Sequence, residues 1–184
     1  IYGKGRWAYS TIYSLSIGQG EVEVIPMQMA NIAAIMANKG YYYTPHVVKS
    51  IQEADTVSPL YYPKINTSVS SKYYDVIHEG MRAVVEEPGG TARRAKIDSI
   101  TVCGKTGTAQ NPHGEDHSVF IAFAPMENPK IAIAVYVENA GFGGTWAAPI
   151  ASLMMEKYLT GEIKNKAKEE RILKADIINR KNMQ

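Results

Sequence analysis

Two apolar segments, residues 119–124 and 130–137, constrain the fold of this chain more than any other feature. They read Val-Phe-Ile-Ala-Phe-Ala and Lys-Ile-Ala-Ile-Ala-Val-Tyr-Val, and the five residues between them begin and end with proline. This arrangement predicts two antiparallel strands joined by a short turn. Because neither segment alternates apolar with polar residues, both faces of the hairpin must be covered by other parts of the chain.

Helices and a further strand are predicted on either side of the hairpin. Residues 26–38 begin with proline and are apolar nearly all round, which predicts a buried helix. Residues 70–86 predict a helix with one apolar face, ended by Pro-Gly-Gly. Residues 99–108 predict a strand with a glycine-spaced end, and residues 147–159 predict a last helix.

The stretch between the first two helices is less regular. Residues 41–51 read as a strand that Pro45 restricts to a sheet edge, and residues 53–69 read as a polar loop. The predicted helices and strands follow one another along the chain without an internal repeat. This order predicts an α+β fold in which helices cover an antiparallel sheet.

Composition excludes several classes of protein. The chain has 184 residues, of which 45% are hydrophobic and 21% charged, and it contains one cysteine. These values exclude collagen-like, disulfide-stapled and disordered chains. No apolar run reaches the roughly 18 residues of a membrane span, and the glycine-rich start is not a signal peptide. We expect the chain to be cut from a longer protein.

Residues 162–184 carry more basic than acidic side chains, whereas residues 1–161 are nearly neutral. We expect the last segment to be a basic C-terminal tail, solvated or frayed, and the helical spacing of its apolar residues leaves a weak amphipathic helix as the alternative. No basic stripe interleaved with aromatic residues is present, so a nucleic-acid partner is not expected.

The chemistry concentrates in residues 102–110, where Lys105, Thr106, Gly107 and Thr108 lie at the end of the predicted strand. Lysine supplies positive charge, the threonines supply short donors, and glycine lets a ligand approach the backbone. The group therefore suits an anion, particularly a carboxylate. A phosphate loop is excluded because Ser99 stands where its first glycine should be; an ordinary strand end remains an alternative.

Two other features have plain structural interpretations. Cys103 reads as a small buried strand residue rather than a nucleophile. His113, Asp116 and His117 could suggest a metal, but we expect them to be structural or solvated, and we expect no metal or cofactor.

Several segments together resemble a known family. Lys-Thr-Gly at 105–107 matches the third signature of the serine penicillin-binding proteins and β-lactamases. Gly-Gln-Gly at 18–20 with Pro-Met-Gln-Met-Ala at 26–30, Gly-Thr-Ala at 90–92, and Phe-Ile-Ala-Phe-Ala-Pro at 120–125 resemble segments of class B penicillin-binding proteins. The resemblance covers roughly residues 7–160 and is greatest for the elongation-type subgroup, penicillin-binding protein 2.

The resemblance implies a β-lactamase/transpeptidase-like fold, here with about three of the family's five sheet strands. It implies a peptidoglycan D,D-transpeptidase that cross-links stem peptides through a serine acyl-enzyme. Lys105 would lie near the serine of the second signature, and the Thr106 and Thr108 hydroxyls would hold the carboxylate of the substrate or of a β-lactam. The Thr108 N–H would be an oxyanion donor, and Gly107 would keep the strand open.

The chain departs from the family in two signatures. No lysine has a serine three residues before it, and no asparagine has a serine two residues before it, so Ser-x-x-Lys and Ser-x-Asn are both absent. In the family both precede the Gly-Gln-Gly segment. We therefore expect residues 1–161 to be the C-terminal part of a transpeptidase domain that lacks its nucleophile and is inactive alone.

The resemblance also implies partners and a location. The partners would be peptidoglycan stem peptides, β-lactams and a membrane glycosyltransferase, and the domain would lie on the outer face of the cytoplasmic membrane of a bacterium, anchored by an upstream segment. The isolated chain is expected to self-associate through the open sheet edge at 131–137. The alternatives are a D,D-carboxypeptidase or β-lactamase-related hydrolase, or a non-catalytic module that binds peptidoglycan or a partner.

Overall fold

The computed structural model describes residues 7–48 and 63–177. Its helices and strands are, in chain order, α1 (Tyr9–Ser16), α2 (Pro26–Ala37), β1 (Tyr41–Tyr42), β2 (Ile65–Asn66), α3 (Tyr74–Glu86), β3 (Cys103–Ala109), β4 (His117–Ala124), β5 (Ile131–Val137), α4 (Ala147–Thr160) and α5 (Lys166–Leu173). Short 3₁₀ turns precede α3 and follow it. None of the helices within these two ranges is long and apolar enough to cross a membrane.

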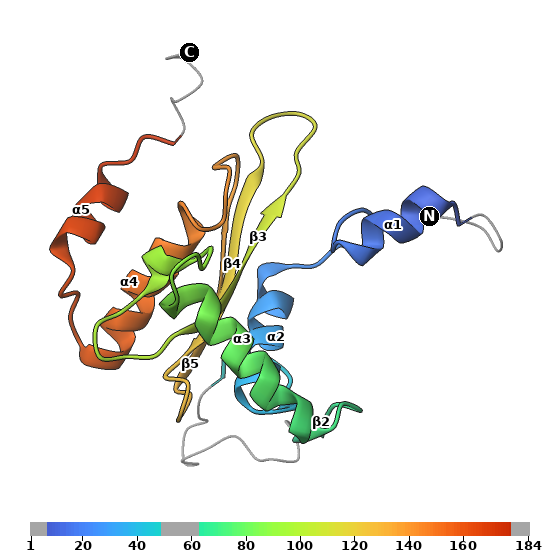
Figure 1. Ribbon diagram of the computed structural model, residues 1–184, viewed down its shortest axis with the longest axis horizontal. Coiled ribbons are helices and arrows are strands. Elements are labelled where there is room, and N and C mark those ends of the chain that lie inside the picture. The colour runs from blue at the N-terminus through green and yellow to red at the C-terminus, as the bar shows by residue number, and fades with distance from the viewer. Residues whose placement is uncertain (1–6, 49–62, 178–184) are drawn as a thin grey trace.

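Strands β3, β4 and β5 form an antiparallel sheet in that order (Figure 1). The predicted hairpin is confirmed, with Ser118 opposite Val137 at one end and Ala124 opposite Ile131 at the other. β3 pairs with the other side of β4. Among the described strands, β3 and β5 are therefore the two edges of this sheet.

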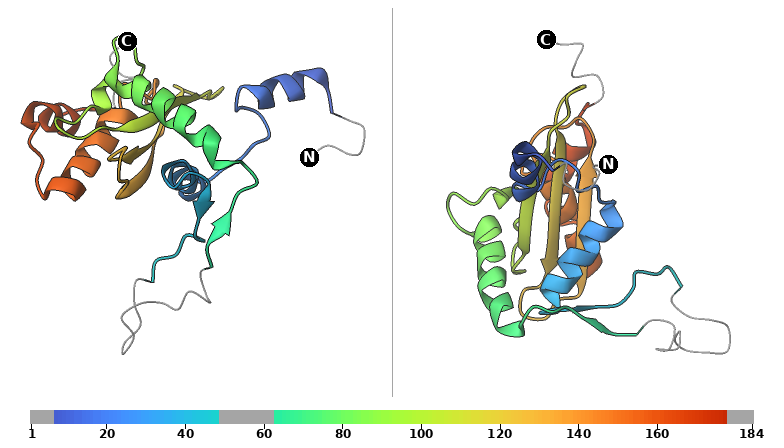
Figure 2. Two further views of the ribbon diagram at one scale, coloured as in Figure 1. Left: turned by 60° about the horizontal axis from the view of Figure 1, so that its bottom comes forward. Right: turned by 90° about the vertical axis from the view of Figure 1, so that its right-hand side faces the viewer.

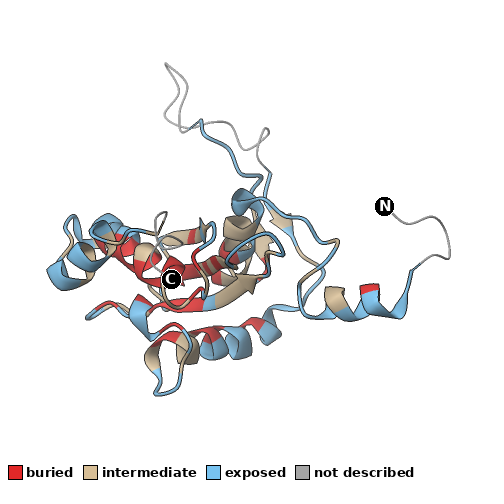
Figure 3. Cartoon of the chain, turned by 90° about the horizontal axis from the view of Figure 1, so that it is seen from above, coloured by how far each residue is buried: buried red, intermediate tan, exposed pale blue. Residues whose placement is uncertain are grey.

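Helices cover both faces of the sheet, as the apolar hairpin requires. α2 lies over β4 and β5, α3 lies beside β3, and α4 covers the opposite face (Figure 2). Phe120 of β4 belongs to the core on the α4 side, whereas Phe123 packs on the other face with Met81 of α3 and Ala37 of α2. The buried residues gather around the sheet and α4 (Figure 3), and the expected α+β fold is confirmed.

α2 and β5 are less buried than the sequence predicts. In α2, Ala33 and Ala37 are buried, but Met27 is 53% and Ile32 is 42% exposed. In β5, Ile133 is buried, and its neighbours are half-buried or exposed. The described residues contact α2 from the sheet, from α3 and from β1, which leaves part of its surface exposed, and β5 has a neighbouring strand on one side alone.

The predicted strand at 41–51 is much shorter in the structure. Its described part forms a strand only at Tyr41–Tyr42, which pairs with β2 inside the predicted polar loop, and residues 49–62 lie outside the described ranges. Similarly, the strand predicted from Ser99 begins at Cys103, because Ser99 has a positive φ of 64° within a turn closed by an Ile97–Ile100 bridge. The helix α1 was not predicted.

The C-terminal segment is helical over part of its length. It forms α5, which begins with the Asn165 side chain accepting a hydrogen bond from the backbone N–H of Lys168. α5 packs against α4 but has no buried residue, so this stretch is a solvent-exposed helix rather than a frayed terminus, in agreement with the helical alternative. The expectation for residues 178–184 lies outside the described residues.

We expect Phe120→Ala to lower the free energy of unfolding by about 3–5 kcal/mol, because it removes a fully buried ring from the core between β4 and α4. Urea denaturation followed by circular dichroism measures this change. Phe142→Ala is the matched control, since this ring is 74% exposed. Its expected effect is within about 0.5 kcal/mol. Equal losses in the two variants would contradict the assignment of the core.

Candidate active site

The four residues singled out in the sequence lie along one edge strand. Lys105, Thr106, Gly107 and Thr108 fall in the middle of β3, and β4 pairs with one side of that strand. Lys105 is exposed and the other three are half-buried. The structure therefore presents these residues at an accessible edge of the sheet.

The alternation along β3 divides these side chains between two faces. Gly104 lies on the face of Phe120, because a Cβ on this glycine would come within 2.3 Å of the Phe120 ring. Thr106 and Thr108 share that face. Lys105 lies on the opposite face with Cys103, and its Nζ donates a 2.8 Å hydrogen bond to the carbonyl oxygen of Thr106.

Thr106 has a side-chain partner from a distant part of the chain. Its Oγ1 lies 2.9 Å from Oγ1 of Thr91, and the two hydroxyls share one hydrogen bond. Thr91 lies between α3 and the following 3₁₀ turn, where Ala92 donates its backbone N–H back to Val84 in α3. The end of α3 thereby fixes one face of β3.

A glycine pair before α4 closes the same region. A Cβ on Gly143 would lie 2.2 Å from the Val119 carbonyl oxygen and 2.5 Å from that of Gly107. A Cβ on Gly144 would lie 2.2 Å from the carbonyl oxygen of Thr91. Only residues without a side chain fit so close to backbone atoms. The loop over 141–146 thus packs directly against both Thr91 and β3.

Sequence reasoning missed Thr91 and the glycine pair as parts of this site. Thr91 was noted within Gly-Thr-Ala, but nothing in the sequence places its hydroxyl beside Thr106. The sequence contains one signal for Gly143 and Gly144, because paired glycines outside a flexible linker often mark a place where two backbone segments come close together.

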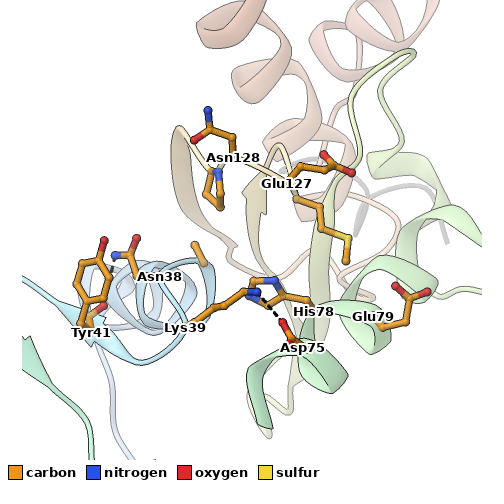
Figure 4. Close-up of a pocket in the computed structure, with 11 residues that line it drawn as sticks. Asn38, Lys39, Tyr41, Asp75, His78, Glu79, Glu127 and Asn128 are labelled. Atoms are coloured by element: carbon orange, nitrogen blue, oxygen red, sulfur yellow. Dashed lines mark hydrogen bonds and ion pairs between the residues drawn. The ribbon is translucent and has the colours of Figure 1, made fainter. Parts of the chain in front are cut away.

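A cavity of about 640 Å³ lies at another place, between α2, α3 and the β4–β5 turn (Figure 4). Lys39 and Asp75 form a 2.6 Å ion pair there, and this pair lowers the pKa of the Asp75 carboxyl. The buried His78 ring lies 2.6 Å, measured from Nε2, from the carbonyl oxygen of Met36. None of the four candidate residues on β3 lines this cavity.

The His113, Asp116 and His117 side chains do not form a metal site in the structure. Asp116 accepts a hydrogen bond from the backbone of Asn111, and Nδ1 of His117 accepts one from the backbone of Asn139. Within residues 7–48 and 63–177, no group of three or more His, Cys, Asp or Glu could hold a metal ion. Asp116 instead stabilises the loop between β3 and β4, and His117 binds the segment that follows β5.

Cys103 is fully buried at the start of β3. Its Sγ donates a 3.5 Å hydrogen bond to the carbonyl oxygen of His78. Burial, together with the nearby carboxylates of Glu127 and Glu79, raises the pKa of this thiol to about 12. The thiol is therefore protonated at neutral pH, as a structural cysteine should be.

Comparison with known proteins shows what this chain resembles. Residues 2–156 match the model of the penicillin-binding protein transpeptidase domain. Peptidoglycan D,D-transpeptidase MrdA of Haemophilus influenzae is 38% identical over 175 residues, which are 85% of this chain and 27% of that protein. Peptidoglycan D,D-transpeptidase PbpA of Mycobacterium tuberculosis is 35% identical over 164 residues, 80% of this chain and 32% of the relative.

Solved structures agree with these relatives. The crystal structure of PBP2 from Pseudomonas aeruginosa matches with a TM-score of 0.72 and 36% identity, over 87% of this chain and 35% of that one. A ceftriaxone acyl-enzyme of penicillin-binding protein A from M. tuberculosis matches with a TM-score of 0.68 and 33% identity, over 80% of this chain and 35% of that one. The chain thus spans about a third or less of the length of these relatives.

We expect Cys103 in the native chain to react with iodoacetamide at pH 8 at least about 100-fold more slowly than in urea, because a pKa near 12 leaves almost no thiolate. Mass spectrometry of samples quenched over time measures the rate. Cys103→Ala removes the single thiol of the sequence and is the blank. Similar rates in the native and unfolded chains would contradict the burial described above.

Proposed function

We propose that this chain, which belongs to the penicillin-binding protein transpeptidase domain family, is part of a peptidoglycan D,D-transpeptidase and supplies the carboxylate-binding strand of its active site. The observation that carries this proposal is the accessible edge strand β3, with Lys105, Thr106 and Thr108 in its middle and Thr91 held against Thr106. The relatives named D,D-transpeptidase support it.

The shared hydrogen bond between Thr91 and Thr106 favours this role. A hydroxyl has one proton to donate and two lone pairs. When Thr91 donates to Thr106, the Thr106 proton remains free for the carboxylate of a stem peptide or of a β-lactam. Thr108 is on the same face two residues further along, so its hydroxyl can reach the same carboxylate.

The chemistry also needs a serine that this sequence does not contain in the required pattern. In the proposed reaction, serine Oγ attacks the carbonyl carbon between the two D-alanines, the bond to the terminal D-alanine nitrogen breaks, and the serine proton passes through a neighbouring amine to that nitrogen. An amine of a second stem peptide then attacks the ester and returns the proton to the serine oxygen. The Thr108 backbone N–H would stabilise the oxyanion in both steps.

Lys105 has a separate role in this proposal. Its side chain is exposed on the face of β3 opposite Thr106, where it can reach groups contributed by other segments of the enzyme. We assign it to the serine of the second signature, where its charge raises the local positive potential. Gly107, between the two threonines, keeps the strand open to the ligand.

The organisation and setting of the complete protein follow from the same proposal. Residues 1–161 would be the C-terminal part of the transpeptidase domain and residues 162–184 a basic tail that begins with α5. The enzyme would act in the bacterial cell envelope, on the outer face of the cytoplasmic membrane, anchored upstream and paired with a membrane glycosyltransferase. The match of residues 2–156 to the family model supports placing most of residues 1–161 in the transpeptidase domain.

The isolated chain is expected to form no covalent adduct with a β-lactam, because acylation has no serine in a Ser-x-x-Lys pattern to accept the acyl group. Incubation with a fluorescent penicillin, followed by a denaturing gel, tests this. A labelled band that persists after boiling would show that another residue is the nucleophile. The complete enzyme, which should label, is the positive control.

In the complete enzyme, Lys105→Ala and Thr108→Val should each slow acylation by about 10²–10³-fold, since each removes a charge or a hydroxyl that acts on the carboxylate or the developing oxyanion. Stopped-flow kinetics with a chromogenic cephalosporin measures the rate.

The controls separate chemistry from folding. Lys130→Ala removes an exposed lysine in the turn after β4 and should leave the rate unchanged. Thr108→Ser keeps the hydroxyl and should recover most of the activity. Near-normal rates for both Lys105→Ala and Thr108→Val would refute the proposed site.

The isolated chain is also expected to self-associate. The outer edge of β5 has no strand partner among the described residues, and unpaired edges of apolar sequence pair with other chains. Sedimentation velocity over a range of concentrations measures the association. Tyr136→Lys places a charge at an exposed position of β5 and should weaken it. A monomer at every concentration would mean that other residues of the chain cover this edge.

A further inference from the structure

α5 is attached to the rest of the protein through a half-buried lysine. Lys168 Nζ donates hydrogen bonds to Ser152 Oγ in α4, at 2.7 Å, and to the carbonyl oxygen of Lys96, at 2.9 Å. Ser152 is fully buried. The pKa of the Lys168 amine is lowered, because the effect of burial is larger than the opposing effect of the nearby Glu156 carboxylate. This contact fixes the orientation of α5 against α4.

Arg171 follows Lys168 by three residues and therefore lies on the same side of α5. It donates a 3.0 Å hydrogen bond to the carbonyl oxygen of Thr145, and its guanidinium carbon lies 5.2 Å from the centre of the Trp146 ring. Trp146 is 4% exposed and immediately precedes α4. Arg171 thus contacts the last two residues of the loop that covers β3.

The other side of this loop contacts the candidate active site. Gly143 packs on the backbone of Gly107, and Gly144 packs on Thr91 and lies near the Thr106 methyl group. Other hydrogen bonds also hold the loop: Ser118 Oγ donates to the carbonyl oxygen of Phe142 and accepts from the backbone N–H of Ala147, and the backbone N–H of Gly141 donates to the carbonyl oxygen of Asp116. A continuous series of contacts therefore connects α5 with Thr106, although α5 lies on the α4 side of the sheet (Figure 1).

We propose that Arg171 is a positioning residue for acylation, which acts through the 141–146 loop to hold Thr91 against Thr106. The guanidinium binds Thr145 and Trp146, and these residues keep the glycine pair pressed on β3. When Arg171 is lost, the loop loosens, and the Thr106 hydroxyl is no longer fixed where the carboxylate binds. This inference rests on the proposed transpeptidase function. It gives the C-terminal segment a part in catalysis without contact with the substrate.

The test compares variants of the complete enzyme for the second-order rate of acylation by a chromogenic cephalosporin, and for hydrogen–deuterium exchange of residues 103–109 and 141–148. Arg171→Ala should lower the acylation rate about threefold to tenfold and raise exchange in both segments, because small displacements of binding groups cost rate. Lys166→Ala is the matched control, because it removes a cation from the same helix. The Lys166 side chain is 73% exposed, and its one ion pair among the described residues is with Glu169. It should change neither measurement.

Two further variants distinguish positioning from general stabilisation. Arg171→Lys keeps a donor for the Thr145 carbonyl oxygen and should recover part of the rate. In a Thr91→Val background, Arg171→Ala should cost less than about twofold, because the connection to Thr106 is already broken. A purely stabilising role for Arg171 would give additive losses instead.

The possible results separate the two proposals. If the unmodified enzyme does not react with the cephalosporin, the proposed function fails, while the exchange data still report whether Arg171 holds the loop. If the enzyme reacts and Arg171→Ala behaves like Lys166→Ala, the positioning role is wrong. Additive effects of Arg171→Ala and Thr91→Val on the rate would also overturn it.

Discussion

The burial of β4 on both faces is the constraint on which the rest of the structure depends. Phe120 packs toward α4, and Phe123 packs toward α2 and α3, so each face of this strand contributes to a separate apolar core. Burying an aromatic side chain is among the largest single contributions to folding. Because β3 is paired to β4 along its whole length, the position of Lys105, Thr106 and Thr108 is set by this doubly covered strand.

The sequence predicted those parts of the fold that depend on local patterns. The β4–β5 hairpin was readable because two apolar runs flank a short turn, and the Lys-Thr-Gly strand was readable from its residue types. The burial of α2 and the burial of β5 were overestimated for the same reason. The apolar character of α2 and β5 indicates burial, but it does not say whether the described chain supplies the covering residues.

Contacts between distant segments were not predictable in the same way. The hydrogen bond between Thr91 and Thr106 joins residues on separate elements, and its existence depends on how α3 ends beside β3. The basic composition after residue 161 suggested a solvated tail, yet Lys168 and Arg171 bind backbone carbonyl oxygens of the body. Charge composition alone cannot distinguish a solvated cation from one with such a partner.

The burial of Cys103 has a practical consequence for spectroscopy. It is the single cysteine of the sequence, and it is enclosed at the start of β3 with a protonated thiol. A second cysteine placed on the surface would be the reactive thiol, so fluorophores or spin labels could be attached to chosen sites without first removing the native one. With one such cysteine on α5 and one on the loop before α4, the distance between these two segments is open to direct measurement in solution.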